Sequence, residues 1–291
     1  MEHDVRTPDG RSLHVIEGGD PDGLPVVVHH GTPGCALQYE PHAADAAERG
    51  IRLITYDRPG YGGSTPHEGR SVADAAADVT VIADALSVGR FATYGGSGGG
   101  PHTLACAALL PDRVVGAVPI ASVAPVGAEG LDWLAGMGQA NVDEFGAAQE
   151  SRETLAQFTA RERDELLAAD PAAMVEAIRT LVSPVDADAL TGELGDYMLA
   201  SIRGAIDESV EGWVEDDLAF LEPWGFDLEN ITVPVALWHG EQDLFVPIAH
   251  GRWLAAHLSG AEVHLESEHG HLSLTARVPD VHAWVVERFQ A

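Results

Sequence analysis

Apolar residues along the chain gather in two kinds of segment, and these alternate. Short, mostly apolar runs of strand length stand at residues 26–29, 90–94, 113–122, 231–240 and 261–267, and another begins at residue 51. Between them lie segments typical of helices, several with apolar residues at helical spacing, at 36–50, 71–86, 103–110 and 248–258, and a last one begins near residue 272. This alternation predicts an α/β fold with a mostly parallel sheet that helices cover on both faces.

Two stretches depart from the alternation. At the start, two extended runs flank Asp9-Gly10, a pair typical of a hairpin turn. From about residue 126 to 226 the strand pattern disappears, and the segment reads as mostly helical. We therefore expect a core built from residues 1–125 and 227–291, with residues 126–226 inserted as a helical unit into one connection of the sheet.

The net charge of the chain excludes some classes of binding partner. It holds 46 acidic residues against 16 basic ones, for a formal net charge of −30 at pH 7. Such a surface repels nucleic acid and anionic lipid, so we expect neither as a partner. No apolar run is long enough to cross a bilayer and the first residues do not resemble a signal peptide, so the cytoplasm is the expected location. The partner that we expect is therefore a small-molecule substrate, and the sequence does not indicate the oligomeric state.

The most informative short segment is Gly95-Gly96-Ser97-Gly98-Gly99, between an expected strand and an expected helix. A dinucleotide fingerprint would need a further glycine where Pro101 or Thr103 stands, and a phosphate-binding P-loop would need a lysine, which the chain lacks. The segment does fit G-x-S-x-G, the sharp turn that exposes a nucleophilic serine. A Cβ two residues before or after the serine would strike the neighbouring strand or helix, which explains the glycines.

A serine nucleophile needs a base and an acid that orients the base. Asp243 follows a late apolar strand, with Glu241 closer to the turn as its competitor. Three histidines are candidates for the base. We expect His264 to be structural, because it alternates with apolar neighbours, and we predict His271 as the base, because it follows Gly270 and precedes the last helix. His269 is the alternative base, and a metal site of the three is the weaker interpretation because no cysteine lies near them. The order Ser97, Asp243, His271 is that of α/β hydrolases.

An oxyanion needs two backbone donors. The N–H of Gly98 follows the nucleophile at a helix N-terminus and supplies one. The second is expected in His30-Gly31-Thr32-Pro33-Gly34, and Thr32 is the predicted donor because Pro33 has no N–H.

Five ordered motifs together resemble the α/β-hydrolase superfamily over about residues 1–125 and 227–291: residues 30–34, 57–62 and 95–99, then Asp243 and Gly270-His271. Residues 30–34 and 95–99 are similar to the proline iminopeptidase branch, whose usual forms are HGGPG and GGSWG, and the chain departs from these at Thr32 and Gly98. The resemblance implies that Asp57 and Arg58 shape a loop without doing chemistry, and that the insertion is a helical cap over the pocket.

The sequence thus predicts a serine hydrolase that cleaves an ester or amide bond through an acyl-enzyme on Ser97, with no cofactor and no metal. One alternative is an aminopeptidase, which would need cap carboxylates for the substrate's ammonium group; residues 207–217 hold several, which we expect to be solvated. A non-enzymatic binding module is another, and cleavage of a carbon–carbon bond or a lyase reaction on the same triad stays open. Four cap residues are candidates for the pocket lining but are expected in the core: Trp133, Met137, Phe145 and Trp213.

Overall fold

The computed structural model describes residues 1–170, 173, 176 and 178–290, and in them eight strands form one sheet in the order β1-β2-β4-β3-β5-β6-β7-β8. The strands are β1 (Glu2–Arg6), β2 (Ser12–Gly19), β3 (Leu24–His29), β4 (Ile51–Tyr56), β5 (Phe91–Gly96), β6 (Val114–Ile120), β7 (Ala236–Gly240) and β8 (Glu262–Glu266). The strands from β3 to β8 pair in parallel. The predicted hairpin is confirmed, since β1 and β2 pair antiparallel around the turn at Gly10.

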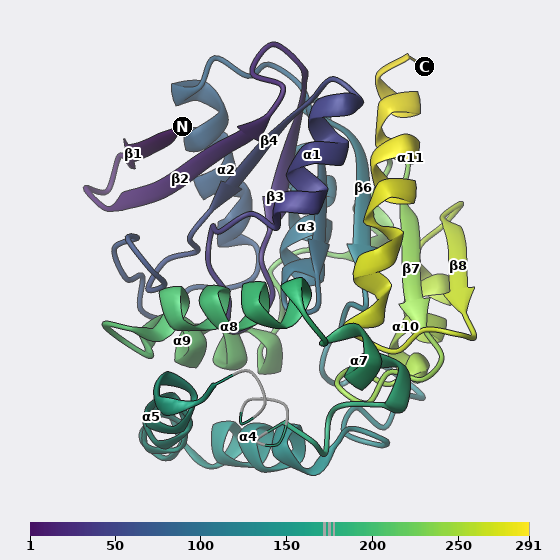
Figure 1. Ribbon diagram of the computed structural model, residues 1–291. Coiled ribbons are helices and arrows are strands. Elements are labelled where there is room, and N and C mark those ends of the chain that lie inside the picture. The colour runs from purple at the N-terminus through teal and green to yellow at the C-terminus, as the bar shows by residue number, and fades with distance from the viewer. Residues whose placement is uncertain (171–172, 174–175, 177, 291) are drawn as a thin grey trace.

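Helices cover both faces of the sheet, as the continuous apolar strands predict (Figure 1). On one face, α1 and α11 pack over strand residues such as Val26 and Leu53. On the other, α2, α3 and α10 pack over the alternate residues, such as Val27 and Ile54. The covering helices are α1 (Glu40–Glu48), α2 (Asp74–Ala85), α3 (Gly99–Leu109), α10 (Ile248–His257) and α11 (Val278–Gln290).

Several predicted helix boundaries are wrong. Helix α3 begins at Gly99, four residues before the predicted start at Thr103, and two other helices differ for a local reason. The helix predicted over 36–50 begins at Glu40, because the chain before it is bonded elsewhere: the Ala36 N–H donates to Asp57 Oδ1 at 2.6 Å. The last helix, predicted from about 272, is preceded by a short 3₁₀ helix, η2 (Ser273–Arg277). The α-helix α11 then begins at Val278 with Pro279 in its first turn, where a missing N–H is tolerated.

The helices between β6 and β7, here called the cap helices, lie together beyond the carboxyl ends of the strands (Figure 1). They are α4 (Gln139–Glu150), α5 (Arg152–Ala168), α7 (Pro184–Ala189), α8 (Glu193–Ile206) and α9 (Glu211–Leu221). Leu155 and Val214 join α5 to α9, and a second apolar cluster contains Leu199, Ile206 and Trp213. Among the described helices, none has both the length and the apolar content that crossing a bilayer requires.

Candidate active site

Ser97 stands at the corner between β5 and α3. Its φ is +54°, in the left-handed region, which costs a non-glycine residue roughly 1–2 kcal/mol. The turn is held by the Ser97 N–H, which donates to the Ile120 carbonyl of the neighbouring strand at 2.8 Å. A tight turn therefore projects this side chain beyond the edge of the sheet, where the cap helices face it.

The glycines around Ser97 are required for the reason expected from the sequence. A Cβ on Gly95 would lie 2.5 Å from the Gly99 carbonyl oxygen in helix α3, and a Cβ on Gly99 would overlap the His29 carbonyl oxygen of β3. Both contacts are with backbone, which cannot move aside. The strand, the turn and the helix fit together only because these two positions carry no side chain.

Asp243 and His271 come together at the same edge of the sheet. His271 Nδ1 and Asp243 Oδ2 are 2.7 Å apart, and both side chains are buried. The other carboxyl oxygen, Asp243 Oδ1, accepts the N–H groups of Phe245 and Val246 at 2.9 and 2.7 Å. The competing carboxylate, Glu241, is exposed and pairs with Arg252 at 3.0 Å. Asp243 is thus the acid that the fold fixes against the histidine.

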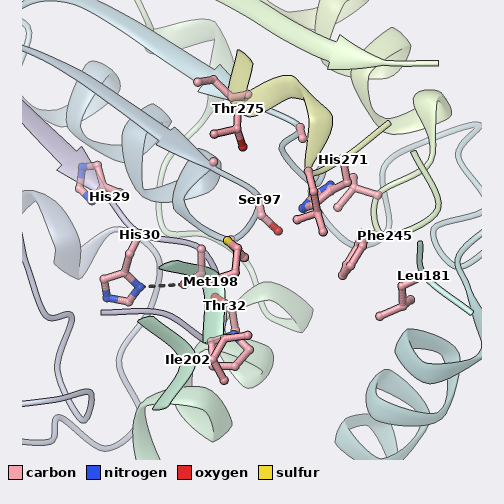
Figure 2. Close-up of a pocket in the computed structure, with 18 of the residues that line it drawn as sticks. His29, His30, Thr32, Ser97, Leu181, Met198, Ile202, Phe245, His271 and Thr275 are labelled. Atoms are coloured by element: carbon pink, nitrogen blue, oxygen red, sulfur yellow. Dashed lines mark hydrogen bonds between the residues drawn. The ribbon is translucent and has the colours of Figure 1, made fainter. Parts of the chain in front are cut away.

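His271 faces Ser97 (Figure 2). The His271 ring stacks on Phe245, with centroids 4.6 Å apart. Burial by itself lowers the pKa of His271, but the charge and hydrogen bond of Asp243, together with the charge of Asp186, outweigh it and raise the pKa above its ordinary value. An imidazole with its Nδ1 held by a carboxylate has its Nε2 free to accept a proton from a neighbouring hydroxyl.

The two other candidate histidines lie elsewhere. His264 is part of β8, where its ring stacks on Trp238 and its Nε2 is 2.9 Å from Glu262 Oε1. His269 lies half-buried in the turn before Gly270, and its carbonyl accepts the Gln242 N–H at 3.0 Å. The structure therefore places only His271, among the three, against Asp243 and opposite Ser97.

The two residues predicted to bind the oxyanion lie next to each other. A Cβ on Gly31 would stand 3.6 Å from Ser97 Cβ, so this loop lies against the serine. Gly98 is the N-cap of α3, and a Cβ on it would overlap the Thr32 hydroxyl and lie 3.0 Å from Phe220 Cζ. The two departures from the iminopeptidase motifs are therefore linked, because the side chain of Thr32 occupies space that a larger residue at position 98 would need.

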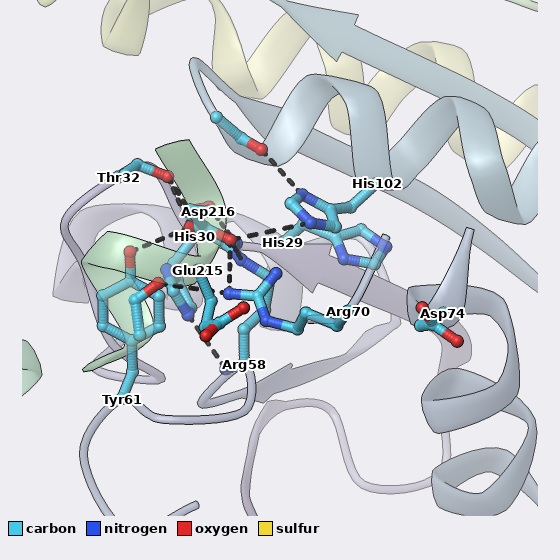
Figure 3. A network of polar contacts seen from close by, with 12 residues as sticks. His29, His30, Thr32, Arg58, Tyr61, Arg70, Asp74, His102, Glu215 and Asp216 are labelled. Atoms are coloured by element: carbon cyan, nitrogen blue, oxygen red, sulfur yellow. Dashed lines mark hydrogen bonds and ion pairs between the residues drawn. The ribbon is translucent and has the colours of Figure 1, made fainter. Parts of the chain in front are cut away.

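The Thr32 loop is tied to the cap through a buried ionic network that the sequence did not reveal (Figure 3). Asp216 of α9 accepts the Thr32 hydroxyl at 2.6 Å and pairs with Arg58 and Arg70, also at 2.6 Å. Arg58 in turn donates to the Gly31 carbonyl at 3.0 Å. Burial disfavours the charged Asp216, but the two guanidinium groups hold its pKa well below the usual range. A cap carboxylate thus fixes the loop that carries Thr32.

A cavity of about 350 Å³ connects Ser97 and His271 with the cap. Three of the four hydrophobic cap candidates line it while also being buried: Met137, Phe145 and Trp213. The fourth, Trp133, packs on Phe145 behind the cavity and donates its indole N–H to the Ala124 carbonyl at 2.7 Å. All four residues are thus buried as expected, and three of them also line the cavity, as the sequence had left open.

Two carboxyl groups of the cap also line this cavity, the half-buried Glu144 of α4 and the buried Asp217 of α9. The Trp213 indole N–H donates to Glu144 Oε1 at 2.6 Å, and the charges of the two carboxyl groups act on each other. Burial and the charge of the neighbouring Glu144 raise the pKa of Asp217 well above its ordinary value. The expectation that the acidic residues of 207–217 are solvated is wrong for Glu215, Asp216 and Asp217, which are buried.

The chain resembles known proteins, some over most of its length and some over about a third of it. The family described as alpha/beta hydrolase fold matches residues 25–275. A non-heme chloroperoxidase from Streptomyces lividans is 30% identical over 292 residues, which covers 97% of this chain and 98% of that protein. A proline iminopeptidase from Neisseria gonorrhoeae is 34% identical over 105 residues, 35% of this chain and 34% of its own length. The structure of a thermophilic esterase from Thermogutta terrifontis superposes with a TM-score of 0.71 at 20% identity, covering 100% and 98%, which is a likeness of fold.

Proposed function

The chain belongs to the α/β-hydrolase fold family, and from that premise we propose that it is a serine hydrolase that cleaves an ester or amide bond of a small molecule. The observation that carries the proposal is the hydrogen-bonded pair of Asp243 and His271 facing a serine on a strained turn. A buried carboxylate that fixes an imidazole opposite a hydroxyl is an arrangement that activates a nucleophile.

In the first half of the reaction, His271 Nε2 takes the proton of the Ser97 hydroxyl as Oγ attacks the carbonyl carbon of the substrate. The imidazolium that forms lies beside Asp243, which stabilises its charge. The carbonyl oxygen becomes an oxyanion, and the N–H groups of Thr32 and Gly98 are the donors that we assign to it. His271 then returns the proton to the departing alcohol or amine, which leaves the acyl group on Ser97.

In the second half, water replaces the leaving group. His271 removes a proton from the water, the hydroxide attacks the acyl carbon, and the Ser97–acyl bond breaks. The proton returns to Ser97 Oγ, so the free acid departs and the resting enzyme is restored. Apart from the substrate and the water, each step uses groups that lie at the carboxyl edge of the sheet, which supports the proposal.

The shape of the cavity favours a small, partly apolar acyl or leaving group. Its volume of about 350 Å³ falls within the range of small-molecule sites. The cap contributes aromatic and sulfur side chains to its wall, Phe145, Trp213 and Met137 among them. Such walls bind apolar groups by burying them, and they leave recognition of polar groups to a few fixed side chains.

The experiment is a panel of p-nitrophenyl esters of increasing acyl length, assayed with the wild type, Ser97→Ala and Ser267→Ala. Ser267 is an exposed loop serine and serves as the matched control. We expect hydrolysis by the wild type and by Ser267→Ala, with only residual turnover by Ser97→Ala. Equal turnover by all three proteins would contradict the proposal.

A second candidate, an aminopeptidase or another hydrolase for substrates with a protonated amine, is favoured by the pair of Glu144 and Asp217. An ammonium group between them would offset the repulsion of the two carboxylates inside the cavity. The test compares aminoacyl p-nitroanilides with their N-acetylated forms in the wild type and in Asp217→Asn. A preference for the free amine that Asp217→Asn removes supports this candidate, and equal rates for the two substrate forms exclude it.

A further inference from the structure

Asp186 of the cap helix α7 lies against the loop that carries the proposed base. Its side chain is wholly buried, and both of its oxygens accept hydrogen bonds from that loop. Oδ2 accepts the His271 N–H at 2.9 Å, and Oδ1 accepts the Ser273 N–H at 2.8 Å. The Ser183 hydroxyl, one turn earlier, also donates to Oδ2 at 2.9 Å. A single cap carboxylate therefore holds two main-chain donors, one of which is that of His271 itself.

Gly270 allows this close approach. A Cβ at position 270 would overlap Asp186 Oδ2 and lie 2.5 Å from Ser183 Oγ. The glycine before the histidine thus leaves room for a carboxylate from another part of the chain. The motifs that pointed to the site in the sequence include no residue of the insertion, so Asp186 is not one of them.

We propose that Asp186 is a positioning residue, which fixes the main chain of His271 from the cap and adds a second negative charge to the surroundings of the imidazole. The proposal rests on the function proposed above, in which His271 is the base. It makes the cap part of the machinery that sets the base in place, in addition to its part in forming the cavity.

The charges around His271 give the proposal a measurable consequence. The groups that act on the ring are Asp243 on the loop after β7, Asp186 on α7 and, through its contact with Asp243 at 3.6 Å, His239 on β7. Burial lowers the pKa of His271, whereas Asp243 and then Asp186 raise it. Loss of the negative charge at position 186 therefore lowers the pKa of His271. A residue that served only to pack the cap would leave that pKa where it is.

The test is the rate at which a fluorophosphonate labels Ser97 of the 291-residue chain, measured from acid to neutral pH. It compares the wild type with Asp186→Asn and with Asp188→Asn, an exposed aspartate on the same helix that serves as the matched control. We expect the plateau rate of labelling to be at least about tenfold lower in Asp186→Asn. The NH₂ group of the new amide would face one of the two N–H donors and displace the loop. We also expect the acid limb of its profile to move to lower pH. Asp188→Asn should match the wild type.

Three outcomes separate the possible errors. If the wild type itself is not labelled at Ser97, the proposed function is wrong. If the wild type is labelled and Asp186→Asn follows the same rate and the same pH profile, the positioning role is wrong. Should Asp186→Asn fail to fold by circular dichroism, Asp186→Ser is measured instead, since it leaves space for water to accept the two N–H groups. An unshifted acid limb in that variant equally overturns the proposal.

Discussion

The sheet and the cap hold the candidate site in different ways. On the sheet, the main chain fixes the reacting groups: Ser97 sits on a strained turn, and two backbone N–H groups orient Asp243. In the cap, buried carboxylates make the contacts with the site: Asp216 holds the Thr32 loop, and Asp186 holds the His271 loop. The sheet therefore carries the proposed reacting groups, while cap carboxylates hold the Thr32 loop and the His271 loop in place.

The composition of the chain makes this division understandable. All 16 basic residues are arginines, and Arg58 and Arg70 are buried under the cap. A buried guanidinium group needs an opposite charge and several acceptors, because an unpaired buried charge is strongly unfavourable. Asp216 supplies that charge from α9. Separation of the cap helices from the sheet would therefore leave Arg58 and Arg70 without their anionic partner.

The largest effect is expected from removing the base or the nucleophile on the sheet. His271→Ala and Ser97→Ala should each lower kcat on an activated ester by about 10⁴- to 10⁶-fold, and the double variant should be little worse than either. His269→Ala is the matched control, since this histidine lies two residues away and outside the Asp243 pair. Its kcat should fall about tenfold or less. If His269→Ala is inactive and His271→Ala is not, the base has been misassigned.

The next effect tests the ionic attachment of the cap. Asp216→Asn leaves Arg58 and Arg70 without their anion, and loss of one member of a buried ion pair costs about 3–5 kcal/mol of unfolding free energy. Urea unfolding measures it, with the exposed Asp207→Asn as control. An unchanged midpoint in Asp216→Asn would show that the network does not hold the cap.

A smaller effect is expected at the contact of Gly98 with Thr32. Gly98→Ala places a methyl group on the Thr32 hydroxyl, and overpacking of this kind costs about 1–3 kcal/mol. Thr32→Gly creates the missing space, so the double variant should be less impaired than the sum of the two single changes. Thermal melting and kcat/KM of all four proteins measure this coupling. Strict additivity would show that the two positions are independent.

The smallest effect is a displacement of the pH profile. The proposed base, His271, can accept a proton only when its imidazole is neutral, so we expect kcat/KM to fall as the pH drops below the pKa of His271. Because Asp243 and Asp186 raise that pKa, the acid limb of the wild type should lie above the ordinary histidine value of 6.5. The measurement is kcat/KM across the acid limb at constant ionic strength. An acid limb below pH 6.5 would contradict the electrostatic account of His271.

The sheet could be predicted well from the sequence, because the patterns that mark strands and turns are local in the chain. Buried strands are continuous apolar runs, and a nucleophile turn needs glycine at fixed distances from Ser97, as Gly95 and Gly99 show. The placement of Asp243 and His271 followed from their positions after late strands of a parallel sheet, whose carboxyl ends meet at one edge. These features could be recognised without knowing any long-range contact.

The cap could not be predicted to the same depth, because the burial of its acids depends on distant partners. Asp216 and Asp217 stand in an acidic segment that looks solvated, and only the fold brings them to Arg58 and Glu144. The sequence did contain one signal of this network. Arg58 lies in a loop motif directly after a buried strand, and a buried arginine in so acidic a chain needs an acidic partner. Asp186 gave no comparable signal, since its partners are backbone N–H groups.

The most direct test of the account is the identity of the residue that becomes covalently modified. The intact protein is treated with a fluorophosphonate, digested, and mapped by mass spectrometry, with Ser97→Ala treated in parallel. The account predicts a single adduct on the peptide that contains Ser97, formed by the wild type and absent from Ser97→Ala. No adduct, or an adduct on another serine such as Ser64 or Ser122, would contradict it.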